Sequence, residues 1–320
     1  MILVFVDHAD GEADAPSLET LTFGRGLAAS LGAPLHAVVI GTDAMADRLG
    51  AFGVGAVHLV RDERLDAFAP AAWAQGIADV VAAATPEAVL APGTDRGNEV
   101  VAHLAAKLAA PFAANCTEVV PGEAFTVTRH LWGGSLLEEA RLSGDVKLLS
   151  VAPHAVAPEE TSPTAPEVLA VQPQLSDADL RVRVTGREAP EGGKVSLGEA
   201  RVVVGGGRGV GSAEGFRSLD ELAALLGGAV GVSRAVTSLG WRPHAEQVGQ
   251  TGTRISPDIY IACGISGATQ HIVGCKGAKR ILAINTDPDA PILAHADHAV
   301  IADLHQVVPA IVAEVRRVQG

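Results

Sequence analysis

The sequence predicts an α/β protein of two domains, each built on a mostly parallel sheet with helices on both faces. Short apolar runs alternate with helical patterns along the chain. These runs are too continuously apolar for strands with one solvent-facing side, which is typical of parallel sheets covered on both faces. The third observation is length, because 320 residues can bury two separate cores.

The first predicted domain covers residues 1–190. Its predicted elements are a strand over 2–6, a helix over 18–31, strands over 35–40 and 57–60, a helix over 71–84, a strand over 88–91 and a helix over 99–108. Residues 92–98 form a turn into the last helix, where we expect an aspartate or asparagine cap. An anion site at that helix terminus is the less favoured alternative.

Residues 153–190 have a different composition. Six of the 18 prolines lie in this stretch, which disfavours regular helices there. Leu180 to Val184 alternates apolar and polar residues as an exposed strand would. We therefore predict edge strands that close the first domain, with a disordered linker as the alternative, and place the boundary near residues 191–193.

The second predicted domain covers residues 195–320. A buried strand over 200–204 leads into a glycine-rich turn, 205–212, in which Ser212 stands where a G-x-G-x-x-G fingerprint needs its third glycine. A helix is predicted to begin at Ser218, with Glu221 completing a capping box, and to end at the glycine pair 227–228. The remaining predicted elements are strands over 230–232, 259–263, 281–284 and 299–301 and a final helix to about residue 317.

Residues 248–271 are the most informative stretch. Two turns rich in glycine and side-chain hydroxyls, 249–252 and 264–267, flank the predicted strand over 259–263. Such turns leave backbone N–H groups uncovered, which suits an anionic ligand with many hydrogen-bonding groups, such as a dinucleotide.

Polar residues also follow the other predicted strands of this domain. Arg208, Ser233 with Arg234, Asn285 and Asp303 each come at or after a strand end. Ligands of parallel sheets bind beyond the carboxyl ends of the strands, so we expect one site. Taken singly, the arginines could pair with surface carboxylates, Asn285 and Asp303 could be turn formers or caps, and His271 could be a core histidine.

Composition excludes several classes of function. The net charge of −13 and the pI near 5.2 argue against nucleic-acid binding. No segment is predicted to enter a membrane and no targeting segment is visible, so we expect a cytoplasmic protein. The three cysteines form no C-x-x-C pair, which indicates buried, reduced thiols. His295 and His298 come closest to metal-ligand spacing, and we interpret both as structural or surface residues.

Six motifs in the second domain resemble those of the electron transfer flavoprotein alpha subunit, in the same order and spacing. They are residues 204–209, 233–236, 248–252, 264–271, 283–287 and 296–303. The resemblance is dense over residues 200–310 and looser over the first domain. The chain departs from the family pattern at Ser238 and Leu239, which precede Gly240 and Trp241 where an aspartate is usual, and at Thr269, which replaces an aliphatic residue.

This resemblance implies that the second domain binds FAD. The implied contacts are Arg208, Ser233, Arg234, Val248, Gly249, Gln250, Thr251, Ser266, Gly267, Ala268, Thr269, Gln270, His271, Asn285, Asp303 and Leu304. Asn285 and Asp303 would hold the adenosine end, and Ser266, Gly267 and the following amides would face the pyrophosphate. Arg234, Thr251 and His271 would surround the isoalloxazine ring, where a guanidinium favours negative charge on the reduced flavin.

The resemblance also implies an electron carrier without a small-molecule substrate of its own, and so not an enzyme. It would take electrons from dehydrogenases such as the acyl-CoA dehydrogenases of fatty acid β-oxidation and pass them to a quinone reductase or similar acceptor. A beta subunit carrying AMP would complete a heterodimer, with the first domain contributing to partner binding. The alternatives are a nicotinamide-dependent dehydrogenase, which the broken glycine fingerprint disfavours, and a non-redox nucleotide-binding module.

Overall fold

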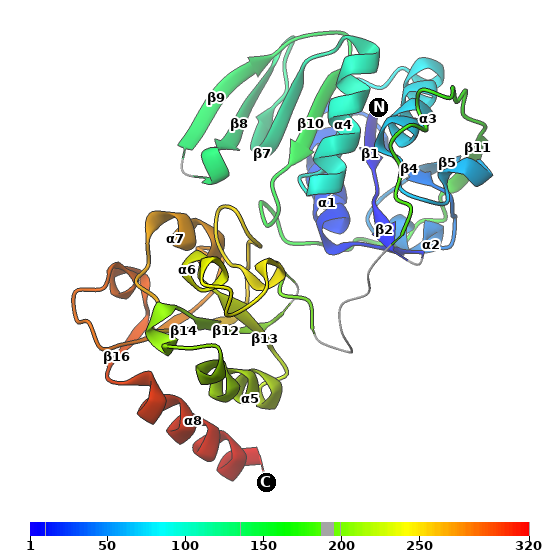
Figure 1. Ribbon diagram of the computed structural model, residues 1–320. Helices are drawn as coiled ribbons and strands as arrows, with labels where there is room; N and C mark the ends of the chain where they lie inside the picture. The colour runs from blue at the N-terminus through cyan, green and yellow to red at the C-terminus, as the bar shows by residue number, and fades with distance from the viewer. Residues whose placement is uncertain (10, 135, 187–194, 199, 320) are drawn as a thin grey trace. The chain divides into compact units, whose positions relative to one another are not determined.

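The computed structural model describes residues 1–9, 11–134, 136–186, 195–198 and 200–319. The chain forms two compact units, Met1–Arg187 and Glu188–Gly320. Each unit is built on its own sheet, with helices on both faces (Figure 1). The predicted fold class, α/β with two mostly parallel sheets, is confirmed.

Unit 1 contains a nine-stranded sheet in the order β11-β5-β4-β1-β6-β10-β7-β8-β9. Its strands are β1 (Ile2–Phe5), β4 (Leu35–Ile40), β5 (Ala56–Val60), β6 (Ala88–Pro92), β7 (Phe112–Val120), β8 (Phe125–Leu131), β9 (Leu136–Leu142), β10 (Lys147–Val151) and β11 (Glu167–Val171). A separate short pair is formed by β2 (His8–Ala9) and β3 (Glu12–Ala13). The helices are α1 (Ala15–Leu31), α2 (Ala46–Gly50), α3 (Pro70–Ala84) and α4 (Asp95–Leu108), with 3₁₀ turns at Glu63–Leu65 and Trp132–Gly134.

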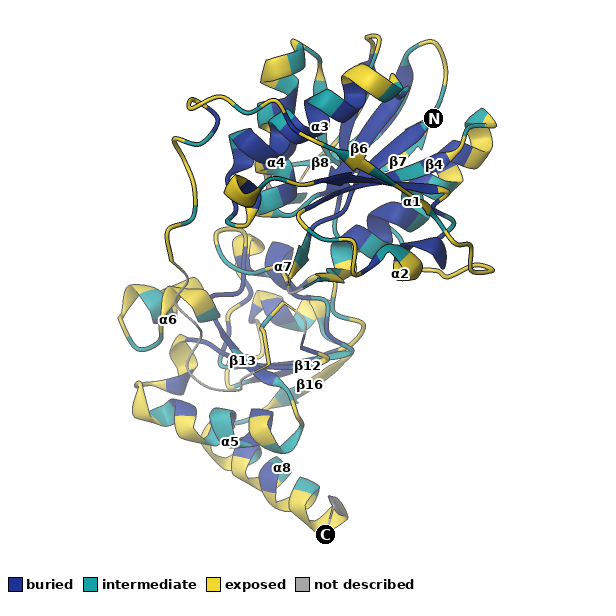
Figure 2. Ribbon diagram, turned by 90° about the vertical axis from the view of Figure 1, so that its right-hand side faces the viewer, coloured by how far each residue is buried: buried dark blue, intermediate teal, exposed yellow. Residues whose placement is uncertain are grey.

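Strand β1 lies between β4 and β6 inside the sheet and is buried on both faces. The dark blue strands of unit 1 in Figure 2 mark this buried part of the sheet. Successive side chains of a strand point to opposite faces. Val4 therefore packs in one core with Leu21 of α1, while Phe5 packs in the other with Trp73 of α3. The continuous apolar run in the sequence follows from this double burial.

Residues 112–151 form four strands that the sequence patterns do not predict. Strands β7, β8 and β9 pair antiparallel, whereas β7 and β10 pair in parallel and join this ribbon to the rest of the sheet. On β8 and β9, Arg129 and Glu138 lie opposite each other and form an ion pair with an N–O distance of 2.6 Å. Cross-strand pairs of this kind stabilise a ribbon that is largely solvent-exposed.

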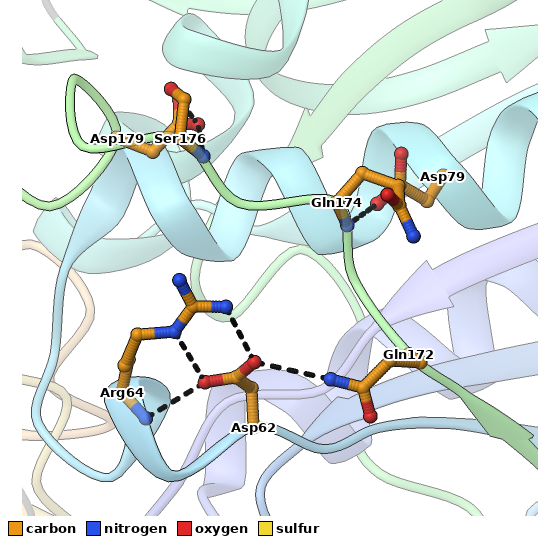
Figure 3. A network of polar contacts seen from close by, with 7 residues as sticks. All are labelled: Asp62, Arg64, Asp79, Gln172, Gln174, Ser176 and Asp179. Atoms are coloured by element: carbon orange, nitrogen blue, oxygen red, sulfur yellow. Dashed lines mark hydrogen bonds and ion pairs between the residues drawn. The ribbon is translucent and has the colours of Figure 1, made fainter.

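The predicted exposed strand at Leu180–Val184 is wrong. The edge strand of this region is β11, which pairs in parallel with β5. After β11, side-chain contacts hold the backbone: Asp79 accepts from the Gln174 N–H at 2.7 Å and Asp62 from the Gln172 amide at 3.1 Å (Figure 3). Leu180 and Val184 pack instead against the core around α3 and α4, which explains their apolar character without a strand.

Two predicted helix caps are also wrong. The cap of α4 is Thr94, whose hydroxyl accepts from the Gly97 N–H at 3.1 Å, rather than an aspartate or asparagine. Helix α5 begins at Arg217 behind a 3₁₀ turn, so Ser218 already lies inside the first turn and no capping box forms. Glu221 instead pairs with Arg316 of the last helix at 2.6 Å.

Unit 2 contains a five-stranded, entirely parallel sheet in the order β13-β12-β14-β15-β16. Its strands are β12 (Val202–Gly206), β13 (Ala229–Val232), β14 (Ile259–Cys263), β15 (Ile281–Asn285) and β16 (His298–Ile301). The helices are α5 (Arg217–Leu225), α6 (Arg234–Ser238), α7 (Thr269–Cys275) and α8 (Leu304–Gln319), with 3₁₀ turns at Arg208–Val210, Glu214–Phe216, His244–Glu246 and Pro291–His295. Gly227, in the left-handed region with φ +61°, ends the α5 segment as predicted.

Helices α5 and α8 cover one face of this sheet, where Leu219 and Val308 join a core with Val204. The opposite core contains Val203, Tyr260 and Ile265, and Ile272 of α7 packs against it. The three cysteines, Cys116, Cys263 and Cys275, are buried and unbridged, and burial raises each thiol pKa to about 12. Among the described residues, no helix has the length and apolarity needed to cross a bilayer.

Candidate functional site

All five strands of unit 2 run the same way, so their carboxyl ends meet at one edge of the sheet. Gly206 on β12 lies beside Val232 of β13 and Cys263 of β14. Cys263 in turn lies beside Ile284, and Asn285 beside Ile301. The predicted site residues follow these strand ends directly, so the fold brings their loops to one edge of the sheet.

A backbone-to-backbone junction joins the loops after β12 and β14. The N–H groups of Gly207 and Gly209 donate to Cys263 O at 2.9 Å and to Gly264 O at 3.0 Å. Gly264 adopts φ +62°, and a Cβ there would lie 2.8 Å from Gly209 Cα and from Leu304 Cδ2. Only glycine combines this backbone angle with this close approach.

A second junction joins the loop at residues 247–253 to helix α7. The Gln250 N–H donates to Gln270 O at 2.8 Å. A Cβ on Gly274 would lie 2.3 Å from the Gly249 nitrogen, so this loop and the helix are in backbone contact. Val248 to Thr251 and Ser266 to His271 are thereby held side by side, as a single site requires.

Gln247 contributes to this site and was missed by the sequence prediction. Its side chain is 2 % exposed and accepts from the Thr237 hydroxyl at 2.7 Å. Its amide nitrogen donates to the Thr251 hydroxyl at 3.0 Å. Gln247 therefore ties helix α6, which begins at Arg234, to the Thr251 turn. No local pattern marks this role, because the bond from Thr237, ten residues away, depends on how helix α6 folds against the Thr251 turn.

Arg208 and Arg234 are exposed, and neither forms an ion pair with a described residue. Arg242, by contrast, pairs with Asp220 at 2.9 Å and Glu246 at 2.6 Å. The structure therefore does not support the alternative that Arg208 and Arg234 neutralise neighbouring described carboxylates. Two uncompensated guanidinium groups at one edge of an acidic protein form a local anion-attracting surface.

The polar side chains at the ends of β15 and β16 make hydrogen bonds within the protein. The Asn285 amide donates to Ile265 O at 2.9 Å and so fixes the loop after β14. Asp303 caps α8, accepting from the His305 N–H at 2.9 Å. Leu304 is buried in the core and offers a ligand its backbone rather than its side chain. Ser266, Ala268, Thr269 and Gln270 are exposed, and the first turn of α7 carries no side-chain cap.

His271 is 6 % exposed, and its Nε2 lies 2.8 Å from the Tyr260 hydroxyl. Nδ1 is buried without a well-aligned partner among the described residues, although a hydrogen bond to the Val248 backbone favours the protonated ring. Burial outweighs that effect and lowers the pKa of His271 to about 4, so the imidazole is neutral at physiological pH. Because a phenol both donates and accepts, Tyr260 supports either neutral tautomer.

The depressed pKa predicts acid-sensitive stability. An unfolded histidine takes up a proton near pH 6.5, whereas folded His271 resists protonation until about pH 4. The unfolded state thus binds more protons in this window, and stability falls as the pH is lowered through it. We expect the FAD-free protein to lose on the order of 3 kcal/mol of unfolding free energy from this group between pH 6.5 and 4.

Urea unfolding at a series of pH values measures this loss as the difference between the native chain and His271→Gln. The matched control is the exposed His305→Gln, which should keep the full pH dependence. An unchanged pH slope in His271→Gln would contradict the neutral, buried assignment.

The site suits a large anionic cofactor by its own chemistry. It combines two arginines without a described ion-pair partner, a glycine-walled backbone junction, exposed hydroxyl and amide side chains, and a buried imidazole. Among the described residues, no group of three or more histidine, cysteine or acidic side chains could hold a metal ion.

Comparison with known proteins identifies both units. Residues 196–276 match the electron transfer flavoprotein FAD-binding domain, and residues 2–176 match the electron transfer flavoprotein domain. The electron transfer flavoprotein subunit alpha of Clostridium acetobutylicum is 36% identical, over 98% of this chain and 96% of that protein. The subunits alpha of Megasphaera elsdenii and Mycobacterium tuberculosis H37Rv are 34% and 36% identical, each over 100% of this chain and over 97% and 99% of their own lengths. The matched FAD-binding domain contains most of the strand-end residues described above. The chain belongs to the electron transfer flavoprotein alpha-subunit family, with FAD as its cofactor.

Proposed function

We propose that this chain is the FAD-carrying subunit of a two-subunit electron carrier, and that the strand-end residues of unit 2 are its FAD contacts. The observation that carries the proposal is the convergence of Arg208, Arg234, the Thr251 turn and the Ser266–His271 segment at one sheet edge within the matched FAD-binding domain. FAD supplies the redox chemistry, and the protein supplies binding, orientation and electrostatics.

At the dinucleotide end, the proposed contacts are held by the backbone framework. Ser266, Gly267 and the amides that follow face the pyrophosphate, in a loop that the glycine junction fixes. Asp303 and Asn285 face the adenosine. Asn285 already makes two side-chain hydrogen bonds within the protein and Asp303 makes one, so both positions are fixed before the ligand binds.

At the flavin end, Arg234, Thr251 and His271 control the charge around the isoalloxazine ring and the position of the ring. Arg234 brings a positive charge that favours electron uptake by the ring. Gln247 sets the Thr251 hydroxyl relative to helix α6. Tyr260 orients the His271 ring, which stays neutral and can donate a single hydrogen bond.

The assembly follows from the family. The partner is the beta subunit, with AMP bound to it; the electron donors are dehydrogenases such as acyl-CoA dehydrogenases, and the acceptor is a quinone reductase or similar protein. On this proposal the chain transfers electrons between proteins and has no small-molecule substrate, so it is not an enzyme in its own right. Cytoplasmic localisation stays a prediction that cell fractionation tests.

A visible absorption spectrum of the chain co-purified with a co-expressed beta-type subunit tests the proposal. We expect a yellow complex with FAD in a one-to-one ratio to this chain, reduced stepwise by dithionite. A nicotinamide-dependent dehydrogenase or a non-redox nucleotide module would give a colourless complex that cannot be reconstituted with FAD. That outcome would overturn the proposal.

A further inference from the structure

Unit 1 contains a cavity of about 630 Å³ that takes no part in the function proposed above. Its walls include His8, Thr42, Phe68, Trp73 and Arg96. This volume lies within the range of about 300–1,000 Å³ that is usual for small-molecule sites. All of its lining residues belong to unit 1, so the cavity is separate from the FAD-binding domain.

The cavity lies where the strand order of unit 1 changes direction. From β1 the chain moves outward through β4 and β5, and then returns to place β6 on the other side of β1. His8 follows β1, Thr42 follows β4 and Arg96 follows β6. Crevices at the carboxyl ends of strands beside such a reversal are the usual ligand sites of open parallel sheets.

Three side chains that line the cavity have a buried polar atom without a hydrogen-bond partner among the described residues: His8 Nδ1, Trp73 Nε1 and Arg96 Nε. Trp73 is only 4 % exposed. Buried polar atoms are normally paired, because an unpaired one costs about 1–3 kcal/mol. Three such atoms beside one cavity point to a ligand that pairs with them.

The chemistry of these atoms specifies the ligand's hydrogen-bonding edge. His8 Nε2 lies 2.8 Å from Ile40 O, and a carbonyl can only accept, so Nε2 carries the proton and Nδ1 of the neutral ring is an acceptor. Trp73 Nε1 and Arg96 Nε are donors. The complementary ligand therefore offers a donor to His8 and acceptors to Trp73 and Arg96.

The walls also favour a planar ring. Phe68 and Trp73 meet edge to face with ring centroids 5.0 Å apart. The Arg96 guanidinium lies 4.4 Å from the Phe68 centroid and 5.1 Å from the Trp73 centroid, and it is fixed by an ion pair with Asp7 at 2.9 Å. Aromatic and guanidinium planes of this kind stack on heterocyclic bases.

We propose that this cavity binds a purine-type heteroaromatic ring, as the base of a nucleoside or nucleotide, through His8, Trp73 and Arg96. A purine edge carries a donor beside ring-nitrogen acceptors, which matches the three unpaired atoms. Reaching them requires side-chain adjustments, because all three atoms are covered. The site is independent of the FAD proposal, since it uses unit 1 alone.

Equilibrium dialysis of the FAD-loaded complex with AMP, adenosine and ribose 5-phosphate tests this inference. To separate this site from any nucleotide site in the partner subunit, binding is compared between native and variant chains. We expect one AMP or adenosine site that Trp73→Phe, which keeps an aromatic side chain but is smaller than indole and lacks the N–H, weakens about tenfold. Preference for AMP over adenosine would assign a nucleotide, and equal affinities a nucleoside.

Arg96→Gln should weaken the same site by a similar factor. Its matched control is Arg48→Gln. Arg48 also stacks on a phenylalanine, Phe52, and pairs with a carboxylate, Glu160. It does not belong to the lining of the cavity. Trp132→Phe, at an exposed tryptophan, controls for Trp73→Phe. FAD absorbance and the thermal unfolding midpoint show whether each variant is folded.

Native binding that Trp73→Phe and Arg96→Gln leave unchanged would overturn the inference. So would the absence of any AMP or adenosine site beyond those of the partner, or ribose 5-phosphate binding as tightly as AMP. Loss of FAD colour in the native complex would instead count against the proposed electron carrier, so the two failures are distinguishable.

Discussion

Gly264→Ala will weaken FAD binding by about 100-fold, because overpacking at this junction costs roughly 1–3 kcal/mol and displaces the loops that hold the cofactor. The left-handed backbone strain, about 1–2 kcal/mol, lowers the stability of the fold in addition. The new Cβ would lie 2.8 Å from Gly209 Cα and from Leu304 Cδ2. Neither neighbour can yield easily, since one is backbone and the other belongs to a buried core side chain. The loops after β12 and β14 must separate, and the proposed pyrophosphate contacts at Ser266 and Gly267 move with them.

Gly211→Ala is the matched control. Gly211 lies in the loop after β12 and also has a positive φ, +84°, but nothing lies within 4 Å of the Cβ that alanine would add. It therefore carries the backbone strain without the overpacking, and FAD affinity should stay within about threefold of native. Fluorescence titration of the FAD-free protein measures both affinities, and circular dichroism verifies the fold. Native-like affinity in Gly264→Ala would show that the junction does not shape the site.

Arg234→Ala will make the midpoint potential of the bound flavin more negative. Reduction adds negative charge to the ring, and an unpaired guanidinium stabilises that charge because no described carboxylate neutralises it first. A tenfold change in a one-electron equilibrium corresponds to about 59 mV, and we expect a shift of at least this order. Arg234→Lys keeps the charge but not the planar fork, so its potential should fall between the two.

Spectroelectrochemical titration of the complex provides the measurement. The control is Arg280→Ala, which removes an equally exposed arginine without a described ion pair at the opposite, amino end of β15. Screening by solvent and salt should leave its potential within about 10 mV of native. If both substitutions gave the same shift, net charge rather than the position of Arg234 would set the potential.

The sequence by itself determined the two-sided sheets and the position of the functional loops. The apolar runs that became β1, β12 and β14 have no polar face, so they can only be central strands. Glycine and hydroxyl residues after those strands locate the turns, because glycine adopts the positive φ angles found at Gly264 and Gly267 with the least steric cost. These signals depend only on residues that are close together in the chain, so they can be interpreted without knowing which strands pair.

Elements that depend on non-local pairing were not predictable. Strands β7 and β9 mix buried and exposed positions irregularly, and their pairing with β8 is what makes them strands. Leu180 to Val184 has the alternation of a strand. Its path is set instead by packing against the α3–α4 core and, just before it, by the bonds of Gln174 with Asp79 and of Asp179 with Lys107. In both cases tertiary contacts decided between conformations that the local sequence permits.

The site residues also divide into those that the sequence identifies and those that only the structure reveals. Arg208, Arg234 and His271 could be named from their motifs, but only the structure shows that the arginines lack described ion partners and that Tyr260 buries the imidazole as a neutral base. Gln247, which links Thr237 to Thr251, has no motif at all. The cavity of unit 1 is the extreme case. His8, Trp73 and Arg96 are far apart in the chain, and the tertiary fold brings them to the lining of one cavity. Charge and burial belong to neighbours in space, which a linear sequence does not specify.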